Sequence, residues 1–212
     1  MDKQPLRHLK EMVMSEISVI GASGHAKVII DVIEDLGYSI GTVYDQDIRK
    51  RNLLGFEIVH DFKDLPKQTI IAIGNNFIRK KIAEIHSFEL KALAHPKSTI
   101  SKYAELGDGT VVMAGVSVNA DTKIGEYCIL NTNCSIDHDC RIADFVHISP
   151  NAALAGNVEV GECTHIGIGA CIKQGVIIGR DCIIGAGAVI IKDIPDGMTI
   201  VGNPGKELKR IK

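Results

Sequence analysis

The chain has 212 residues and a net charge of −2, from 24 basic and 26 acidic side chains. This balance gives no electrostatic reason to expect binding to nucleic acid or to an anionic membrane. Aromatic residues make up 4% of the chain and tryptophan is absent, which argues against aromatic stacking platforms for bases or glycans. No apolar stretch reaches the ~20 residues that span a bilayer, so we predict no integral membrane segment.

Residues 1–14 are charged and lack the apolar region of a signal peptide, so we expect a leader or extension of a cytoplasmic protein. Thiols stay reduced in that compartment, and we expect the six cysteines to be free.

Residues 15–95 predict an α/β, Rossmann-like domain. The expected elements are strands over 17–20, 40–44, 69–73 and 91–94 and helices over 26–36 and 77–86. A glycine-rich loop, GASGH at 21–25, joins the first strand to the first helix, and Asp45 ends the second strand. A helix N-terminus binds phosphate well, and an acid about 20 residues further on suits a ribose hydroxyl.

The GASGH loop does not match the GxGxxG fingerprint, so a dinucleotide is not indicated. A nucleoside diphosphate carrying a sugar fits this loop better. The alternative is a tight turn with a structural role only.

From Ile100 to Ile190, every sixth residue is Ile, Leu or Val, and a small residue follows most of them four positions later. This period predicts an all-β left-handed parallel β-helix of hexapeptide repeats over 96–194. Each hexapeptide would form a strand and a turn, and three would make one coil. Glycine often follows the aliphatic residue, as suits a repeated corner. Residues 195–212 leave the register and are expected to cap the last coil.

Most cysteines fall in the inward column of small residues, and we expect them to be core thiols. These are Cys128, Cys134, Cys140 and Cys182. An inward Cys140 argues against a covalent intermediate on this thiol, and the absence of a CxxC spacing argues against a zinc site.

Histidines that point away from the prism are the candidate chemical residues. His138 stands between two acids in DHD at 137–139, and a carboxylate that accepts an imidazole N–H prepares a general base. Neighbours on a strand point to opposite faces, so Asp139 can reach His138 only if the backbone turns there. The alternative is an interface histidine with incidental acids.

His147 and His165 are 18 residues apart and should stack one coil apart. This column fits a ligand groove, a subunit interface or a metal site. The γ-class carbonic anhydrases use a β-helix with two close histidine ligands five residues apart. No such pair occurs in this repeat, so we expect no metal.

From about residue 15 onward the chain resembles the NeuD/PglD family of sugar O- and N-acetyltransferases. The resemblance is carried by VIGASGHAKVIIDVI, IAIGNNFIRKKI, ILNTNCSIDHDCRIADFVHISPNAALAGNVEVGE, THIGIGACIKQGVIIG and VGNPGKELKR. It implies an acetyl-CoA-dependent N-acetyltransferase that acts on the amino group of a UDP-linked amino-dideoxy sugar, in bacterial surface glycan or glycoprotein biosynthesis. It also implies a homotrimer with active sites between subunits.

The resemblance assigns roles residue by residue. His138 matches the general base, and Asp139 the acid that orients it. Acetyl-CoA is placed at His147, Gly156, Ile168 and Ala186. The UDP-sugar is placed at Ser23, Gly24, His25, Asp45, Gln46, Gly74 and Asn131.

Two other functions stay open at this point. One is a sugar or sialic acid O-acetyltransferase, which would acetylate a hydroxyl with the same residues. The other is a non-catalytic trimeric scaffold that binds nucleotide sugars, in which the histidines pack between subunits.

Overall fold

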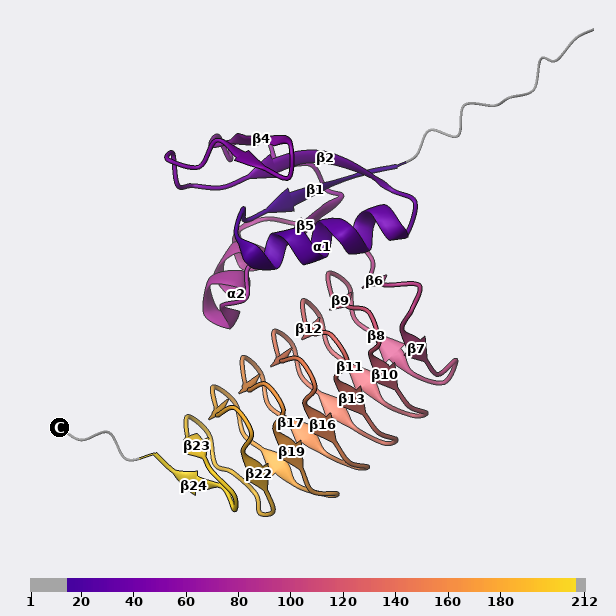
Figure 1. Ribbon diagram of the computed structural model, residues 1–212, viewed down its shortest axis with the longest axis vertical. Coiled ribbons are helices and arrows are strands. Elements are labelled where there is room, and N and C mark those ends of the chain that lie inside the picture. Colours follow the sequence, from indigo (N-terminus) through magenta and orange to yellow (C-terminus); the bar gives the residue numbers. More distant parts are fainter. Residues whose placement is uncertain (1–14, 209–212) are drawn as a thin grey trace, which may run out of the picture.

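The computed structural model describes residues 15–208, which form an α/β domain resting on a parallel β-helix (Figure 1). The expectations for residues 1–14 and 209–212 lie outside the described residues. The predicted Rossmann-like domain and the predicted β-helix are both confirmed. Neither helix in the described part has the length and apolar character needed to cross a membrane.

The N-terminal domain is a five-stranded sheet in the order β3-β4-β2-β1-β5 with two helices. Its elements are β1 (Glu16–Ile20), α1 (Gly24–Asp35), β2 (Ser39–Tyr44), β3 (Asn52–Leu53), β4 (Phe56–Val59), β5 (Thr69–Ile71) and α2 (Asn76–Ile85). Strands β1, β2, β4 and β5 pair in parallel, as expected for a Rossmann-like unit. The hairpin β3–β4 was not predicted, because two residues are too short to show a period.

Three sheets form the faces of the β-helix, and the chain passes from the first face to the second and then the third in each coil. The first face contains β7 (Thr99–Ile100), β10 (Ser117–Val118), β13 (Ser135–Ile136), β16 (Ala153–Leu154), β19 (Cys171–Ile172) and β22 (Val189–Ile190). The second contains β8 (Glu105–Leu106), β11 (Lys123–Ile124), β14 (Arg141–Ile142), β17 (Glu159–Val160) and β20 (Ile177–Ile178).

The third face contains β6 (Leu93–Ala94), β9 (Val111–Val112), β12 (Ile129–Leu130), β15 (His147–Ile148), β18 (His165–Ile166), β21 (Ile183–Ile184), β23 (Thr199–Val201) and β24 (Lys206–Glu207). The strand expected at 91–94 is β6, and it pairs with β9 rather than with the N-terminal sheet. The C-terminal segment continues this face, and Gly205 lies against Ile190 and Ile200 at the end of the core.

The interior of the β-helix is filled by the two predicted columns. Aliphatic residues in register, such as Leu130, Ile148 and Ile166, are fully buried. The predicted core thiols are also buried. Thr122 shows how a polar residue fits the small column, because its hydroxyl donates to the Asp137 carbonyl across 2.7 Å and accepts from the Cys140 amide at 3.2 Å.

Glycine directly after the aliphatic residue was expected to provide the backbone conformation of each corner, but the structure places that conformation at another position. In the turns that follow Leu106 through Ile184, the left-handed residue lies three positions after the aliphatic residue, as at Asp139 with φ of 61° and Asn157 with φ of 56°. Glycines directly after the aliphatic residue serve close packing instead. A Cβ on Gly107 would lie 2.4 Å from the carbonyl carbon of Gly125 in the next coil. Space, rather than backbone conformation, requires those glycines.

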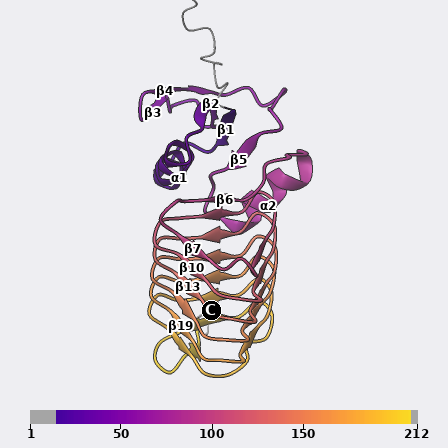
Figure 2. The same cartoon turned by 90° about the vertical axis from the view of Figure 1, so that its right-hand side faces the viewer.

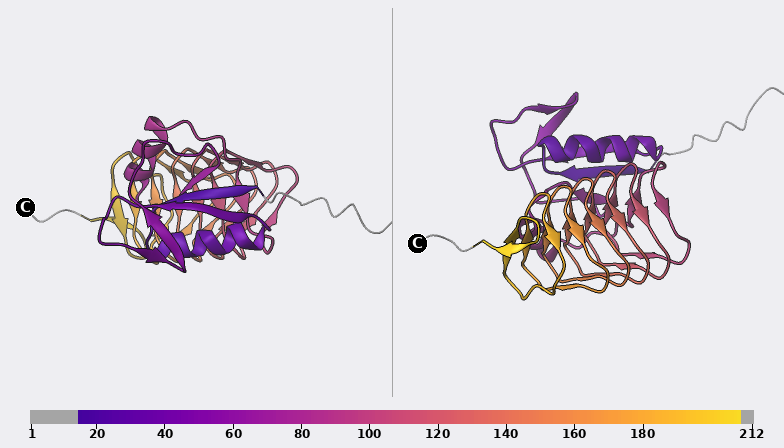
Figure 3. Two further views of the ribbon diagram at one scale, coloured as in Figure 1. Left: turned by 90° about the horizontal axis from the view of Figure 1, so that it is seen from above. Right: turned by 60° about the horizontal axis from the view of Figure 1, so that its bottom comes forward.

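The N-terminal domain lies on the third face (Figures 2 and 3). Outward side chains of this face, Val111 and Ile129, pack into the same core as the helices and sheet of the domain. The domain is fixed at both sides. Asp35 at the end of α1 bonds to Nε2 of His95 across 2.8 Å, and Asn76 at the start of α2 donates to the Cys163 carbonyl at 2.8 Å.

Candidate active site

The GASGH loop is held in place by the second strand. Gly21 donates its amide to the Tyr44 carbonyl across 2.7 Å. Its φ is +106°, and an added Cβ would lie 2.8 Å from the Ala72 carbonyl oxygen, so glycine is required here on both grounds. Ser23 and Gly24 are exposed where α1 begins, which leaves the helix N-terminus open to an anion.

Asp45 links this loop to the end of β2. Its carboxylate accepts the Ala22 amide at 2.8 Å and the Lys50 ammonium at 2.6 Å. Partial burial acts to raise the pKa of Asp45, but these bonds and the Asp47 amide hold it below its usual value. Gln46, which follows Asp45, is exposed. The predicted ribose and base contacts therefore lie at the rim of the loop.

Three histidines gather beneath the loop. The rings of His25 and His147 have centroids 6.1 Å apart, and those of His147 and His165 are 4.6 Å apart. Nδ1 of His147 lies 3.3 Å from the Gly74 carbonyl, and Nε2 lies 3.2 Å from the side-chain amide of Asn131. The structure thus brings together four predicted site residues that are far apart in sequence, with His165 beside them.

The protonation of His147 follows from its partners. A carbonyl can only accept, so Nδ1 of His147 carries the proton and Nε2 accepts from Asn131. The Asn131 oxygen is taken by the Thr132 amide at 2.8 Å, which agrees with that orientation. Burial lowers the pKa of His147 to about 3 and that of His25 to about 4, and Arg79 contributes to both shifts. Both rings are therefore neutral at physiological pH.

Arg79 is a buried residue that the sequence did not single out. Its guanidinium donates to the carbonyls of Tyr127, Ile73 and Phe145 at 2.8 to 2.9 Å and to the side chain of Asn76 at 2.8 Å. No carboxylate is among its hydrogen-bond partners in the described part of the chain. The available signal was its position one helical turn after Asn76, on the side of α2 that faces the β-helix.

His138 stands in the turn between β13 and β14. Its Nδ1 lies 2.7 Å from Oδ2 of Asp139, and the left-handed φ of Asp139 provides the backbone turn that this contact required. The hydrogen bond to Asp139 and the charge of Asp137 raise the pKa of His138 above its usual value. About half of the His138 side chain is exposed, so Nε2 is open to a reactant.

Two more residues hold this turn. Asp137 accepts the His138 amide at 2.8 Å, and Asn119 of the preceding coil donates to the same carboxylate oxygen at 2.8 Å. Asp137 was noted as a flanking acid, whereas Asn119 was missed. Asn119 could have been found from the sequence because it precedes Asp137 by 18 residues, which places the two residues side by side in successive coils.

The structure does not bring His138 to the histidine cluster within one chain. His138 lies at the edge between the first and second faces, whereas the N-terminal domain and His147 occupy the third face. In a three-sided prism that edge is opposite the third face. The four residues predicted for acetyl-CoA are likewise separated: His147 lies on the third face, Gly156 beside His138, and Ile168 and Ala186 in turns between the third and first faces.

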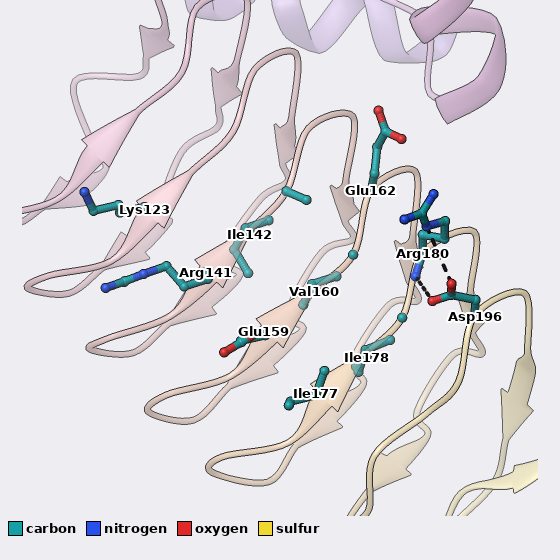
Figure 4. Close-up of a pocket in the computed structure, with 13 residues that line it drawn as sticks. Lys123, Arg141, Ile142, Glu159, Val160, Glu162, Ile177, Ile178, Arg180 and Asp196 are labelled. Carbon is teal, nitrogen blue, oxygen red and sulfur yellow. Dashed lines mark hydrogen bonds and ion pairs between the residues drawn. The ribbon is translucent and has the colours of Figure 1, made fainter.

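Several hollows mark the surface, and one of them is lined by Asn119 and Asp137 beside the His138 turn. A cavity of about 520 Å³ lies along the second face, where Lys123, Arg141 and Glu159 project from successive strands (Figure 4). It contains no predicted site residue. A smaller groove of about 210 Å³ lies between α2 and the third face, beside His165. Within residues 15–208 there is no group of three His, Cys, Asp or Glu side chains that could hold a metal ion.

Family models match both parts of the chain: the PglD N-terminal domain over residues 16–85, and bacterial transferase hexapeptide repeats over 157–192. The acetyltransferase domain of PglB from Neisseria gonorrhoeae is 42% identical with a TM-score of 0.85, covering 91% of this chain and 99% of that one. The chain belongs to the NeuD/PglD family of sugar acetyltransferases.

Other members of the family give the same picture. PerB from Caulobacter crescentus, solved with CoA and GDP-perosamine, is 39% identical with a TM-score of 0.86 and covers 92% of this chain and 98% of that one. The UDP-N-acetylbacillosamine N-acetyltransferase of Bacillus subtilis is 35% identical over 118 residues, 48% of this chain. The aligned part spans 52% of that enzyme, about half of its length.

Proposed function

We propose that this chain transfers the acetyl group of acetyl-CoA to the amino group of a nucleotide-linked amino-dideoxy sugar, with His138 as the general base. The observation that carries the proposal is the 2.7 Å contact between His138 and Asp139 at an exposed corner of the β-helix. Sugar N-acetyltransferases among the relatives support the reaction class, and solved relatives with CoA support the acetyl donor.

The chemistry needs only one proton transfer by the protein. Asp139 accepts a hydrogen bond from the Nδ1–H group of His138, which leaves the lone pair of Nε2 free. The amine nitrogen attacks the thioester carbonyl carbon, Nε2 takes the proton that the amine loses, and the carbon–sulfur bond breaks to release CoA as the thiolate, which takes a proton from water to become the free thiol. Such general base catalysis contributes about 10²–10⁴-fold.

We propose UDP as the nucleotide, bound at Ser23, Gly24, His25, Asp45, Gln46 and Gly74. The exposed start of α1 supports a diphosphate there, because the N-terminal amides and the helix dipole favour negative charge. Relatives act on UDP- and GDP-linked sugars, so both nucleotides belong in the test.

We further propose that the working unit is a homotrimer in which His138 of one copy meets the nucleotide site of the next. The support is the placement of His138 on the edge opposite the third face, which leaves each half of the site incomplete within one chain. Cyclic assemblies repeat one such contact at every interface.

The test is acetyl-CoA-dependent thiol release with a UDP-4-amino-4,6-dideoxy sugar as acceptor, comparing the wild type with His138→Ala. We expect a loss of about 100-fold or more in the variant. The matched GDP-linked acceptor should react at least about tenfold more slowly. Release only with sialic acid or another hydroxyl acceptor would replace this proposal with O-acetylation. A protein that binds UDP but releases no thiol with any acceptor would be a scaffold.

Mixing two inactive variants tests the shared site. Copies with His138→Ala and copies with Asp45→Ala are unfolded together and refolded as mixed assemblies. Random mixing puts both intact halves at one site in four, so about a quarter of the wild-type activity should return. No recovery, in mixtures shown to contain both variants, would place the whole site within one chain.

A further inference from the structure

The imidazole ring of His138 lies against the backbone of Gly156, the residue one coil further along the same edge. A Cβ built on Gly156 would lie 2.6 Å from Cε1, 2.8 Å from Nε2 and 3.1 Å from Nδ1 of His138. Two of these contacts are shorter than 3.0 Å, a separation that Cβ atoms essentially never show, so a neighbouring atom would have to shift. Gly156 is buried, although it sits at the corner of the prism where neighbouring turn residues such as Asn157 are exposed.

Backbone conformation does not explain this glycine. Left-handed φ values occur at Gly115 (+72°) and Gly175 (+72°), whereas Gly156 has no such value. An alanine at 156 could therefore keep the same backbone. The three atoms nearest to its methyl group would all belong to the imidazole of His138, so we expect this ring to move and the β-helix to stay in place.

The ring has little freedom to move without losing its partner. Its Nδ1 is held by Asp139 at 2.7 Å, and the backbone amide of His138 is held by Asp137 at 2.8 Å. Rotation away from residue 156 would draw Nδ1 away from the Asp139 carboxylate. Nε2, which also lies over Gly156, would leave its present direction at the same time.

We propose that Gly156 is a positioning residue that seats the imidazole of His138. The inference rests on the proposed function of His138 as the base. The absence of a side chain at 156 lets the ring lie flat on the next coil, with Nδ1 on Asp139 and Nε2 toward the acceptor amine. Displacements of about 1 Å at a catalytic group can cost 10²-fold in rate.

The experiment compares Gly156→Ala with the wild type and with Gln174→Ala. Gln174 is the exposed residue one coil beyond Gly156 on the same edge, so its variant controls for changes at this corner. We expect Gly156→Ala to lower kcat by about 10–100-fold, with KM for acetyl-CoA within about twofold of the wild type. Gln174→Ala should keep both values.

A second readout follows the ring itself in the free protein. NMR titration of the His138 Cε1 proton should show a lower pKa in Gly156→Ala than in the wild type, because the bond to Asp139 is weakened. A changed KM for acetyl-CoA with an unchanged kcat and titration would overturn the proposal and make Gly156 a ligand contact. Unchanged kinetics and titration would overturn it as well. The titration needs no activity, so it still tests the role of Gly156 if the wild type acetylates no sugar amine. Failure of the proposed function can therefore be distinguished from failure of the Gly156 proposal.

Discussion

The guanidinium of Arg79 donates to the carbonyl of Phe145 across 2.8 Å and so joins the N-terminal domain to the β-helix. A second bond from the same group, 2.9 Å to the Ile73 carbonyl, holds the end of the loop that carries Gly74. The carbonyl of Gly74 in turn accepts a hydrogen bond from the Nδ1–H group of His147. One buried cation therefore fixes the position of the Gly74 segment relative to the β-helix and to His147.

Replacing this cation should uncouple the two domains. Arg79→Met leaves the carbonyls of Tyr127, Ile73 and Phe145 without their donor in a buried place. We expect the free energy of unfolding to fall by about 3 kcal/mol or more, as for other broken buried networks. Urea denaturation at a fixed protein concentration measures it.

Arg49 provides the control for Arg79. Its guanidinium is exposed, and within residues 15–208 it pairs only with Asp47 two residues away. Arg49→Met should leave the unfolding curve in place. An Arg79→Met protein as stable as Arg49→Met would contradict the role assigned to the buried guanidinium, because the carbonyls would then have found other partners.

The histidine cluster should make the fold sensitive to acid. The folded state holds the pKa of His147 at about 3 and that of His25 at about 4, below the ordinary value of 6.5. At pH values between these lowered pKa values and 6.5, the unfolded chain binds protons on the two histidines that the folded chain does not bind. The free energy of unfolding therefore decreases as the pH falls below about 6.5. From pH 7 to pH 5 each histidine should cost about 2 kcal/mol.

The variant His147→Gln isolates this effect, since all other ionisable groups are shared with the wild type. The free energy of unfolding of each protein at pH 5 is compared with its own value at pH 7. The decrease in His147→Gln should be smaller than that in the wild type by about 2 kcal/mol. Equal losses in the two proteins would mean that His147 gains its proton without unfolding.

The thiols should divide into one reactive and five protected groups. Cys171 is the exposed cysteine among the six, all of which lie in the described residues. Burial raises the pKa of Cys128 and of Cys134 to about 12, and it also raises the pKa of Cys140, Cys163 and Cys182. Thiolates are the reactive species, so a disulfide reagent should label one cysteine quickly in the native protein and six in denaturant.

The same labelling tests whether a cysteine takes part in transfer. Cys171→Ala should lose the fast reaction and keep the acetyltransferase activity. Cys140, which is close to His138 in sequence, is buried with its sulfur 3.3 Å from the Ala155 carbonyl, so we expect no acetyl transfer through this thiol either. A radiolabelled acetyl group retained on any thiol after denaturation would contradict direct transfer.

The sequence was informative where one rule repeats. The period of six placed Leu130 and Ile148 inside the β-helix because each coil meets the same packing demand. The contact of His138 with Asp139 followed once the turn was known, but the left-handed residue itself was not predicted. Repetition makes a local pattern a reliable guide to the core.

Contacts between the two domains were beyond that reasoning. Asn76 reaches Cys163 across 87 positions in the chain, and nothing periodic marks such a pair. The predicted site was also scattered over the prism, because its residues match a site that we propose to form between copies. The assignment of Gly156 to acetyl-CoA by resemblance stays a prediction, and the structure adds that this residue lies beside His138.

The last prediction concerns the pH dependence of transfer. The proposed base, His138, must be neutral to act, so kcat/KM should fall at low pH as it gains a proton, and its raised pKa places this limb above the ordinary value of 6.5. Asp139→Asn removes the first cause of that shift, and the limb should move to lower pH while kcat falls by about tenfold or more.

Asp137→Asn is the matched control for Asp139→Asn. It removes a neighbouring charge but keeps an oxygen for the His138 amide, so the limb should move in the same direction with a smaller loss of kcat. Rates measured from pH 5 to pH 9 with both substrates varied give the limb in the free enzyme. A limb that stays in place in both variants would show that another group titrates, because two carboxylates beside His138 cannot both be without effect on its proton.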